Sequence, residues 1–236
     1  MKLLFIDETQ DNNNKEYLGI CCSLTDLTFY GKLKTEFNDI LEKFNWDKGN
    51  ELKGNAIFSI KNGDKNVNIG DRINLVKDLL EENISKKNSR IKFAFVKCKT
   101  TKFKVEYLNV LPKLLDKFLV KAPKNGAGKN IISIHCDHHS AIKPLEIENS
   151  IKSVLNKKNY ILLEGVHCVQ SNNESIGVIY TDIVGYLIGR IDNIKNDIDL
   201  FNNLDDSKKK TSFRKLETST ELIKVIKHIE FFKYGK

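Results

Sequence analysis

Several kinds of segment are missing from this 236-residue sequence. No apolar run approaches the ~20 residues that a membrane-spanning helix needs. The charged, apolar and small-residue series of a secretory signal is absent as well. Neither an internal repeat nor a linker rich in proline, glycine or serine divides the chain, which has only three prolines. We therefore expect a cytoplasmic protein with one main domain and a decorated C-terminal end.

Cysteine is infrequent, and its spacing matches no common motif. Five cysteines, an odd number, lie at positions 21, 22, 98, 136 and 168, and they form no Cys-x-x-Cys pair. Each lies within or beside an apolar run. This pattern is typical of reduced thiols in a core, and it disfavours disulfides and a structural zinc site.

Basic residues outnumber acidic residues, 39 to 31, which gives a formal net charge of +8 and a pI of about 9.1. A surplus of this size is compatible with a polyanionic partner such as nucleic acid. It is equally compatible with a soluble surface or with a bias in genomic base composition. Residues 195–215 concentrate Asn, Asp and Lys, and we expect a solvated loop there that could contact phosphates if it lies beside a nucleic-acid groove.

The hydrophobic pattern predicts an α/β chain. Apolar runs predict strands at residues 3–6, 17–24, 91–98, 130–137 and 160–170, and more weakly at 51–58. The first two strands should form an antiparallel hairpin around a polar turn at 9–15. Helical spacing predicts helices at residues 26–44, 71–84, 105–118, 144–155, 173–194 and 219–234.

Four acidic residues are notable for their positions. Asp7 and Asp137 end two buried strands, and Glu51 begins a third apolar segment. Asp182 lies inside a helix that is apolar almost all round, where a lone charge is costly to bury. If the strands of Asp7 and Asp137 are parallel neighbours, their carboxylates emerge side by side at one sheet edge, and the Asp182 helix could cover that edge.

Carboxylates that are forced together repel one another, and a divalent cation is the simplest way to keep them ionised. Ligand sets made only of oxygen favour Mg²⁺ or Mn²⁺. Plain structural roles remain open for each of the four acids. Asp7 with Glu8 could begin a turn, Glu51 could pair with Lys53 on the surface, and Asp137 could cap a helix or a turn. A plain role is weakest for Asp182, because an aspartate in the middle of a helix caps nothing.

A cluster of histidines, His135-Cys-Asp-His-His139, allows other interpretations. His135, Asp137 and His139 would share one face of a persisting strand and could bind zinc. Alternatively, His138 or His139 lies beside the carboxylates and transfers a proton or contacts a phosphate. Lys53 and Ser175 are similarly placed to meet phosphate oxygens.

These motifs resemble the prokaryotic domain-of-unknown-function 3800 family, which is similar to the ribonuclease H-like superfamily. The resemblance lies in Phe5-Ile-Asp-Glu8, Glu51-Leu-Lys-Gly54, the strand that ends at Asp137, and the segment from Ser171 to Asp182. The sequence departs from the family pattern at Thr9-Gln10, where Ser-Gly is usual, and at Ile179-Tyr180-Thr181, where Gln-Leu-Ala is usual. Substrate contacts near these positions are therefore expected to differ.

The resemblance implies a mixed sheet of five to six strands flanked by helices in residues 1–194. A basic loop and a C-terminal helix in residues 195–236 are expected to pack on the same domain. It further implies that Asp7, Glu51, Asp137 and Asp182 bind Mg²⁺ or Mn²⁺ and support hydrolysis of RNA or DNA, and a role in prokaryotic defence is an expectation that comes with the family. The alternative is a protein of the same fold that binds nucleic acid, or a defence-system partner, without catalysis.

Overall fold

A single mixed β-sheet forms the centre of the structure, a computed structural model that describes residues 1–11, 14–47, 49–55, 67–84, 90–100, 102–124, 128–137, 141–169 and 175–202. Five strands in these residues take the order β3-β2-β1-β4-β5. They are β1 (Lys2–Asp11), β2 (Asn14–Asp26), β3 (Ile91–Lys99), β4 (Ile131–Asp137) and β5 (Ile161–Val169). β2 runs antiparallel to both neighbours, whereas β1, β4 and β5 are parallel.

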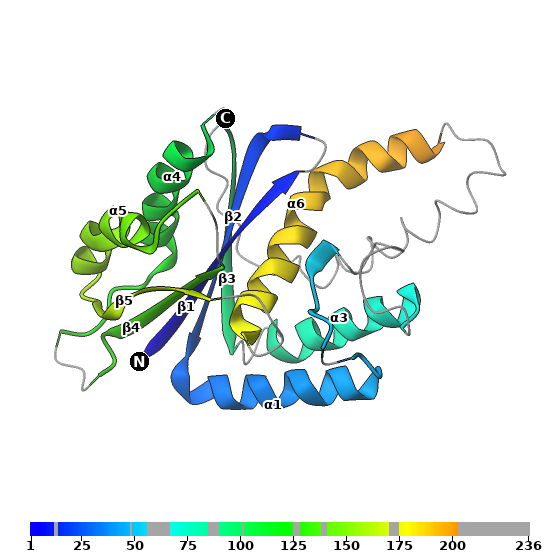
Figure 1. Ribbon diagram of the computed structural model, residues 1–236, viewed down its shortest axis with the longest axis horizontal. Helices are drawn as coiled ribbons and strands as arrows, with labels where there is room; N and C mark the ends of the chain where they lie inside the picture. The colour runs from blue at the N-terminus through cyan, green and yellow to red at the C-terminus, as the bar shows by residue number, and fades with distance from the viewer. Residues whose placement is uncertain are drawn as a thin grey trace.

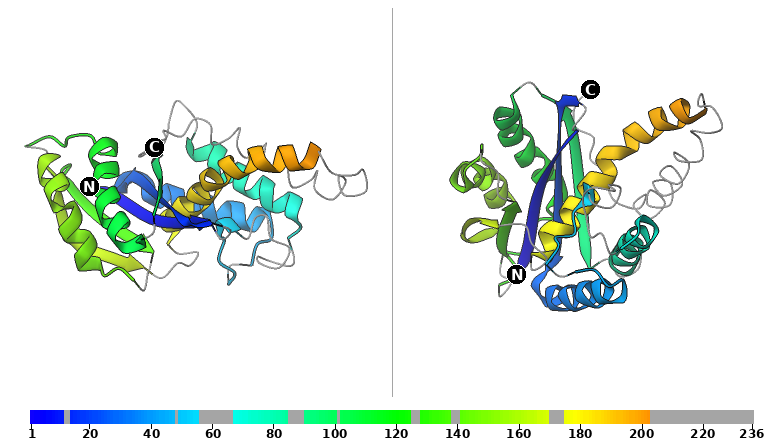
Figure 2. Two further views of the ribbon diagram at one scale, coloured as in Figure 1. Left: turned by 90° about the horizontal axis from the view of Figure 1, so that it is seen from above. Right: turned by 45° about the vertical axis from the view of Figure 1, so that its right-hand side comes forward.

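Helices cover both faces of this sheet, as the view from above in Figure 2 shows. The helices are α1 (Leu27–Lys43), α3 (Ile69–Ile84), α4 (Phe103–Phe118), α5 (Pro144–Lys157) and α6 (Ile176–Asn202). α4 and α5 form one hydrophobic core with the sheet, and α1, α3 and α6 form a second core on the opposite face. The predicted α/β class with a five-stranded mixed sheet is confirmed.

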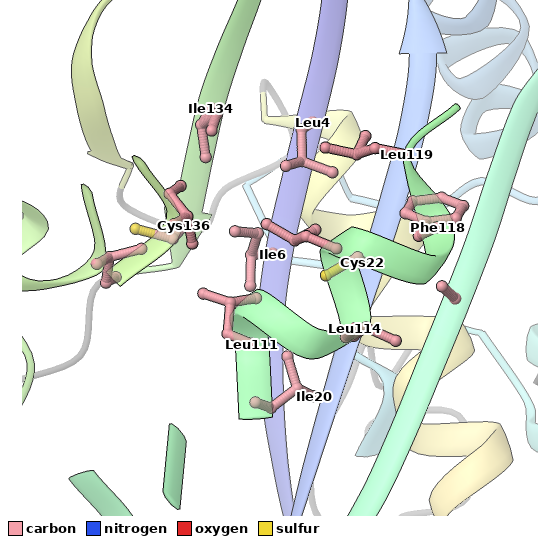
Figure 3. Packing of buried hydrophobic residues seen from close by; sticks show 14 of the residues in the cluster. Leu4, Ile6, Ile20, Cys22, Leu111, Leu114, Phe118, Leu119, Ile134 and Cys136 are labelled. Carbon is pink, nitrogen blue, oxygen red and sulfur yellow. The ribbon is translucent and has the colours of Figure 1, made fainter. Parts of the chain in front are cut away.

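β1 is buried on both faces because it lies in the middle of the sheet (Figure 1). Successive side chains of a strand point to opposite faces. Leu4 and Ile6 belong to the core under α4 and α5, where Figure 3 shows Leu4 beside Leu119 and Ile6 beside Leu111. Leu3 and Phe5 pack on the other face with Val178 of α6. This double burial explains the continuous apolar run at the start of the sequence.

α6 approaches the sheet closely along a row of small residues at every fourth position: Gly177, Thr181, Gly185 and Gly189. A β-carbon on Gly177 would collide with the ring of Phe5, and one on Gly185 would lie 3.0 Å from Cβ of Cys21. Between them, the hydroxyls of Thr181 and Ser23 are 2.7 Å apart and buried. The row therefore lets α6 lie directly on β1 and β2.

The most informative differences from the sequence predictions concern three segments. β1 continues past Asp7 to Asp11 because its polar end stays paired with β2. Glu51 to Lys53 is not a strand, and Gly54 and Asn55 are helical. The helix predicted to end at 194 continues to Asn202, so residues 195–202 are not a loop. In that stretch Ile194, Ile198 and Phe201 keep helical spacing, and this pattern outweighs the polar composition.

Other predictions lie outside the described residues, namely the loop from 203 to 215, the last helix at 219–234, and His138 and His139. All five cysteines are described, and all are free thiols, as predicted. In the part of the chain that the structure describes, no helix has the length and apolar character needed to cross a membrane.

We predict that Gly177→Ala destabilises the fold, because the new methyl group meets the Phe5 ring. That ring has little room to move, since it is stacked between Tyr30 and His135. Overpacking of this kind costs about 1–3 kcal/mol, which urea unfolding can measure. Gly31→Ala in α1 is the matched control, because its β-carbon would meet open space and alanine favours a helix by up to ~1 kcal/mol. Equal stability of the two variants would contradict the close packing of α6.

Candidate metal centre

Asp7 and Asp137 lie at the same edge of the sheet. β1 and β4 are parallel neighbours, and their pairing runs from Lys2 opposite Ile132 to Ile6 opposite Cys136. Asp7 and Asp137 are the next residue on each strand. The parallel arrangement on which the sequence argument depended is therefore present. What ends at Asp7 is the pairing with β4, because β1 itself continues beside β2.

Asp182 is held in place by the segment that carries Glu51. The backbone N–H of Gly54 donates a hydrogen bond of 2.8 Å to Oδ2 of Asp182. Gly54 touches α6 so closely that a β-carbon there would lie 2.5 Å from Cβ of Tyr186. Only glycine permits this approach without displacing Tyr186. The contact gives Asp182 an oriented donor and brings Glu51 to the same region.

Glu51 is half-buried, and only one of its two carboxylate oxygens is paired. Its Oε2 lies 3.0 Å from Nζ of Lys53. Its Oε1 is buried, and it has no hydrogen-bond partner in the described part of the chain. Buried polar atoms are normally satisfied. The unsatisfied oxygen marks a position where a cation or a donor group from a ligand would be stabilising.

The charges of these acids act on one another. Burial raises the pKa of Asp7 well above its usual value, and the charges of Asp182, Glu8 and Asp137 raise it further. Burial also raises the pKa of Asp182 to about 6, assisted by Glu51 and Asp137 and opposed by the Gly54 amide and by Lys53. The other acids are therefore close enough to Asp7 and Asp182 for their charges to disfavour ionisation of these two side chains.

Glu8 also belongs to this electrostatic group. Burial and the charge of Asp137 raise its pKa to about 7. As the neighbour of Asp7 on a strand, it faces the opposite side of the sheet. There Tyr107 of α4 lies within reach of its charge. Burial is the main cause that raises the pKa of Tyr107, and the charge of Glu8 raises it further. The sheet therefore separates the Glu8 side chain from α6, and the charge of Glu8 adds to the repulsion that raises the pKa of Asp7.

Lys53 supplies positive charge to the same region. Burial alone would lower the pKa of its ammonium group, but the hydrogen bond and charge of Glu51, together with Asp137 and Asp182, raise it. About half of its side chain is exposed, so a ligand anion can reach it. This position agrees with the predicted role, although the phosphate contact itself stays a prediction.

The donor set suits a hard divalent cation, because it consists of carboxylates, and the unpaired Oε1 of Glu51 suits a cation as well. The side chains are not assembled, however. Within the described ranges, no three His, Cys, Asp or Glu side chains are grouped so that they could hold a metal ion. Like charges repel, and a cation would have to draw the carboxylates together. The residues thus fit the metal in kind and location, and its binding stays a prediction.

The positions of the other predicted residues, Ser175 and the histidines, say little about metal or substrate binding. The carbonyl of Ser175 accepts hydrogen bonds from the N–H groups of Val178 and Ile179, so Ser175 begins α6, and its contact with substrate stays a prediction. His138 lies outside the described residues, as does His139 of the zinc alternative. The ring of His135 is stacked between those of Phe5 and His167, and its Nε2 lies 3.0 Å from Oγ of Ser133.

One contributor was missed by reasoning from the sequence, namely the Gly54 amide, which had no assigned role. The only sequence signal for Gly54 was a glycine three residues after Glu51. That signal becomes informative only once the segment is known to contact α6.

Comparison of the sequence with protein-family models gives no match, and comparison with curated proteins gives none either. The resemblance to the domain-of-unknown-function 3800 family therefore stays a prediction.

We predict that the metal-free protein loses stability as the pH rises from about 4 to about 7, between the ordinary carboxyl pKa values and the raised pKa values of Asp182 and Glu8. Asp182, with a pKa of about 6 in the folded state against 3.8 normally, binds its proton more tightly when folded. Stability from such a group is present at low pH and is lost as the pH rises through the folded pKa. In EDTA at pH 8, Asp182→Asn should be more stable than the wild type by on the order of 2 kcal/mol.

Urea unfolding at several pH values measures this effect. Asp116→Asn is the control, because its hydrogen bond to Lys157 lowers the pKa of Asp116, so that residue stays ionised over the whole range. The control should keep the wild-type pH slope, and Asp182→Asn should flatten it. A wild-type stability that rises with pH would contradict the raised pKa values.

Proposed function

We propose that this chain is a Mg²⁺- or Mn²⁺-dependent nuclease, in which Asp7, Glu51, Asp137 and Asp182 bind the metal. The observation that carries the proposal is the convergence of these acids. They come from a central strand, a loop, a neighbouring parallel strand and a buried helix, and their charges influence one another. Burying like charges together costs stability, which a fold without use for them has no reason to incur.

Phosphodiester hydrolysis is the reaction that such a site serves best. Bound to these carboxylates, divalent ions would lower the pKa of a water molecule and neutralise the charge of the leaving oxygen. The protein residues position the ligands. The Gly54 amide orients Asp182, and Lys53 offers an ammonium group beside Glu51 for a phosphate oxygen. The net charge of +8 favours a polyanionic substrate over a small neutral one.

The strand order is compatible with a ribonuclease H-like layout, in which the resemblance places an Asp, Glu, Asp, Asp set. Asp7 and Asp137 lie where the pairing of β1 with β4 ends, and α6 packs against β1, in agreement with that expectation. This compatibility supports both the ribonuclease H-like fold and the family resemblance as parts of the proposal. A role in prokaryotic defence is carried over from the family resemblance alone.

One observation favours a second candidate, a nucleic-acid-binding or defence-system partner protein without turnover. In the residues that the structure describes, the acids are near one another but not grouped as metal ligands. A protein that retained the fold and lost catalysis could leave the carboxylates in this state. Metal binding separates the two candidates.

We predict that Mn²⁺ raises the melting temperature of the wild type at neutral pH, because a ligand that binds only the folded state stabilises it. The increase should be absent in Asp182→Asn, which keeps the size of the side chain and an oxygen that can accept from the Gly54 amide. Asp116→Asn, on the surface of α4, should respond like the wild type. If neither Mn²⁺ nor Mg²⁺ changed the melting temperature of the wild type, the proposed metal binding would be contradicted.

We further predict metal-dependent cleavage of at least one of four labelled substrates: single-stranded RNA, single-stranded DNA, duplex DNA and an RNA–DNA hybrid. Each is incubated with Mn²⁺, Mg²⁺ or EDTA. Asp7→Asn should reduce the rate by at least about a hundredfold, since the carboxylates supply most of the electrostatic stabilisation. Binding without cleavage by the wild type would instead favour the non-catalytic candidate.

A further inference from the structure

Two thiols that the proposed function does not use lie against each other. Cys136 of β4 and Cys168 of β5 are register partners on adjacent parallel strands, and their Sγ atoms are 3.3 Å apart. Neighbouring strands are ~4.8 Å apart. That spacing falls within the Cα separation of about 4.4–6.8 Å that a disulfide bridges. The backbone therefore already has the geometry of a crosslink.

The two thiols differ in access. Cys136 is buried in the core under α4 and α5, where Figure 3 shows it near Ile6 and Ile134. Cys168 is half-buried and packs at the margin of that core. A reagent from solvent therefore reaches the Cys168 thiol more easily than the Cys136 thiol.

β5 is the outermost strand on its side of the five-stranded sheet. Its pairing with β4 is interrupted in the middle, since Ile132 lies opposite Leu162 whereas Ile134 lies opposite Val166. The extra residues form a bulge in which Glu164 has a positive φ of 56°. A bulge disrupts the ladder locally. The end of β5 that carries Cys168 is thus held by a short paired segment.

We propose that Cys136 and Cys168 form a dithiol site that small-molecule disulfides oxidise to an intramolecular disulfide. The Cys168 thiol gives up its proton and attacks one sulfur of the reagent, and the released thiolate takes up a proton. The Cys136 thiol then gives up its proton and attacks Sγ of Cys168, which releases the second thiol. Overall, one reagent disulfide is reduced to two thiols, and the protein dithiol becomes a disulfide.

The crosslink would close the chain between Cys136 and Cys168 into a loop and fix β5 to β4 immediately before Asp137. Closing a loop removes freedom mainly from the unfolded chain, which raises stability. The redox state of this pair would therefore set how firmly the outer strand is held. This inference does not depend on the proposed nuclease activity.

The other cysteines provide internal comparisons. Cys21 and Cys22 are consecutive in β2 and belong to the cores on opposite faces, so the sheet lies between their side chains. Cys98 is half-buried, and its thiol donates a hydrogen bond to the carbonyl of Leu18. Cys98 can therefore accept a reagent, but it offers no comparable route to a crosslink.

The experiment treats the folded, full-length protein with oxidised glutathione, blocks the remaining thiols with iodoacetamide, and identifies the products by peptide mass spectrometry. The wild type should yield a peptide crosslinked between Cys136 and Cys168. Cys98→Ser, the matched control, should yield the same crosslink. Cys136→Ser should instead accumulate a glutathione adduct at Cys168, because the second thiol is missing.

The proposal would be overturned if the folded wild type accumulated glutathione at Cys168 without the crosslink. It would also be overturned if Cys168 reacted only after denaturation. Both outcomes are read from the wild type, so the test survives a Cys136→Ser variant that fails to fold. As a second measurement, oxidised wild type should melt at a higher temperature than reduced wild type, and an unchanged melting temperature would count against a crosslink across β4 and β5.

Discussion

The candidate site depends on the close contact between α6 and the centre of the sheet. Gly177, Thr181 and Gly185 lack bulky side chains, so α6 lies directly on β1 and β2. This approach brings Asp182, the residue after Thr181, within electrostatic reach of Asp7. A larger residue in the row would move the helix outward and separate the carboxylates. The packing of small residues therefore sets the geometry of the acids.

The fold opposes the charge cluster that it creates. Desolvation and mutual repulsion raise the pKa values of Asp7, Glu8 and Asp182. A few groups counter this cost, chiefly the Gly54 amide and the ammonium group of Lys53. Protons can relieve the remaining repulsion at low pH, and a cation can do so at neutral pH. Protons and the cation therefore compete for the same carboxylates. This competition connects the pH dependence of stability with the proposed function.

The two faces of the sheet differ in the residues that they carry. The face under α4 and α5 is a hydrophobic core, in which Cys136 lies among apolar side chains. The face under α6 carries Asp7 and Asp182 beside a second apolar core. Glu8 and the Cys136–Cys168 pair lie on the α4 face of the sheet, close to the positions of Asp7 and Asp137. Asp7 and Asp182 are thus separated from Glu8 and the thiol pair by a single layer of strands.

Local patterns were enough to predict the α/β class, most strands and helices, and the unusual status of Asp182, because hydrophobic periodicity and the cost of a buried charge can be read from short stretches of sequence. The continuation of β1 to Asp11 and the absence of a strand at residues 51–53 became evident from the folded chain. Only the tertiary structure revealed the contact of Gly54 with Asp182 and that of Cys136 with Cys168. These features depend on contacts between residues far apart in the chain, and local patterns contain no information about which segments will meet.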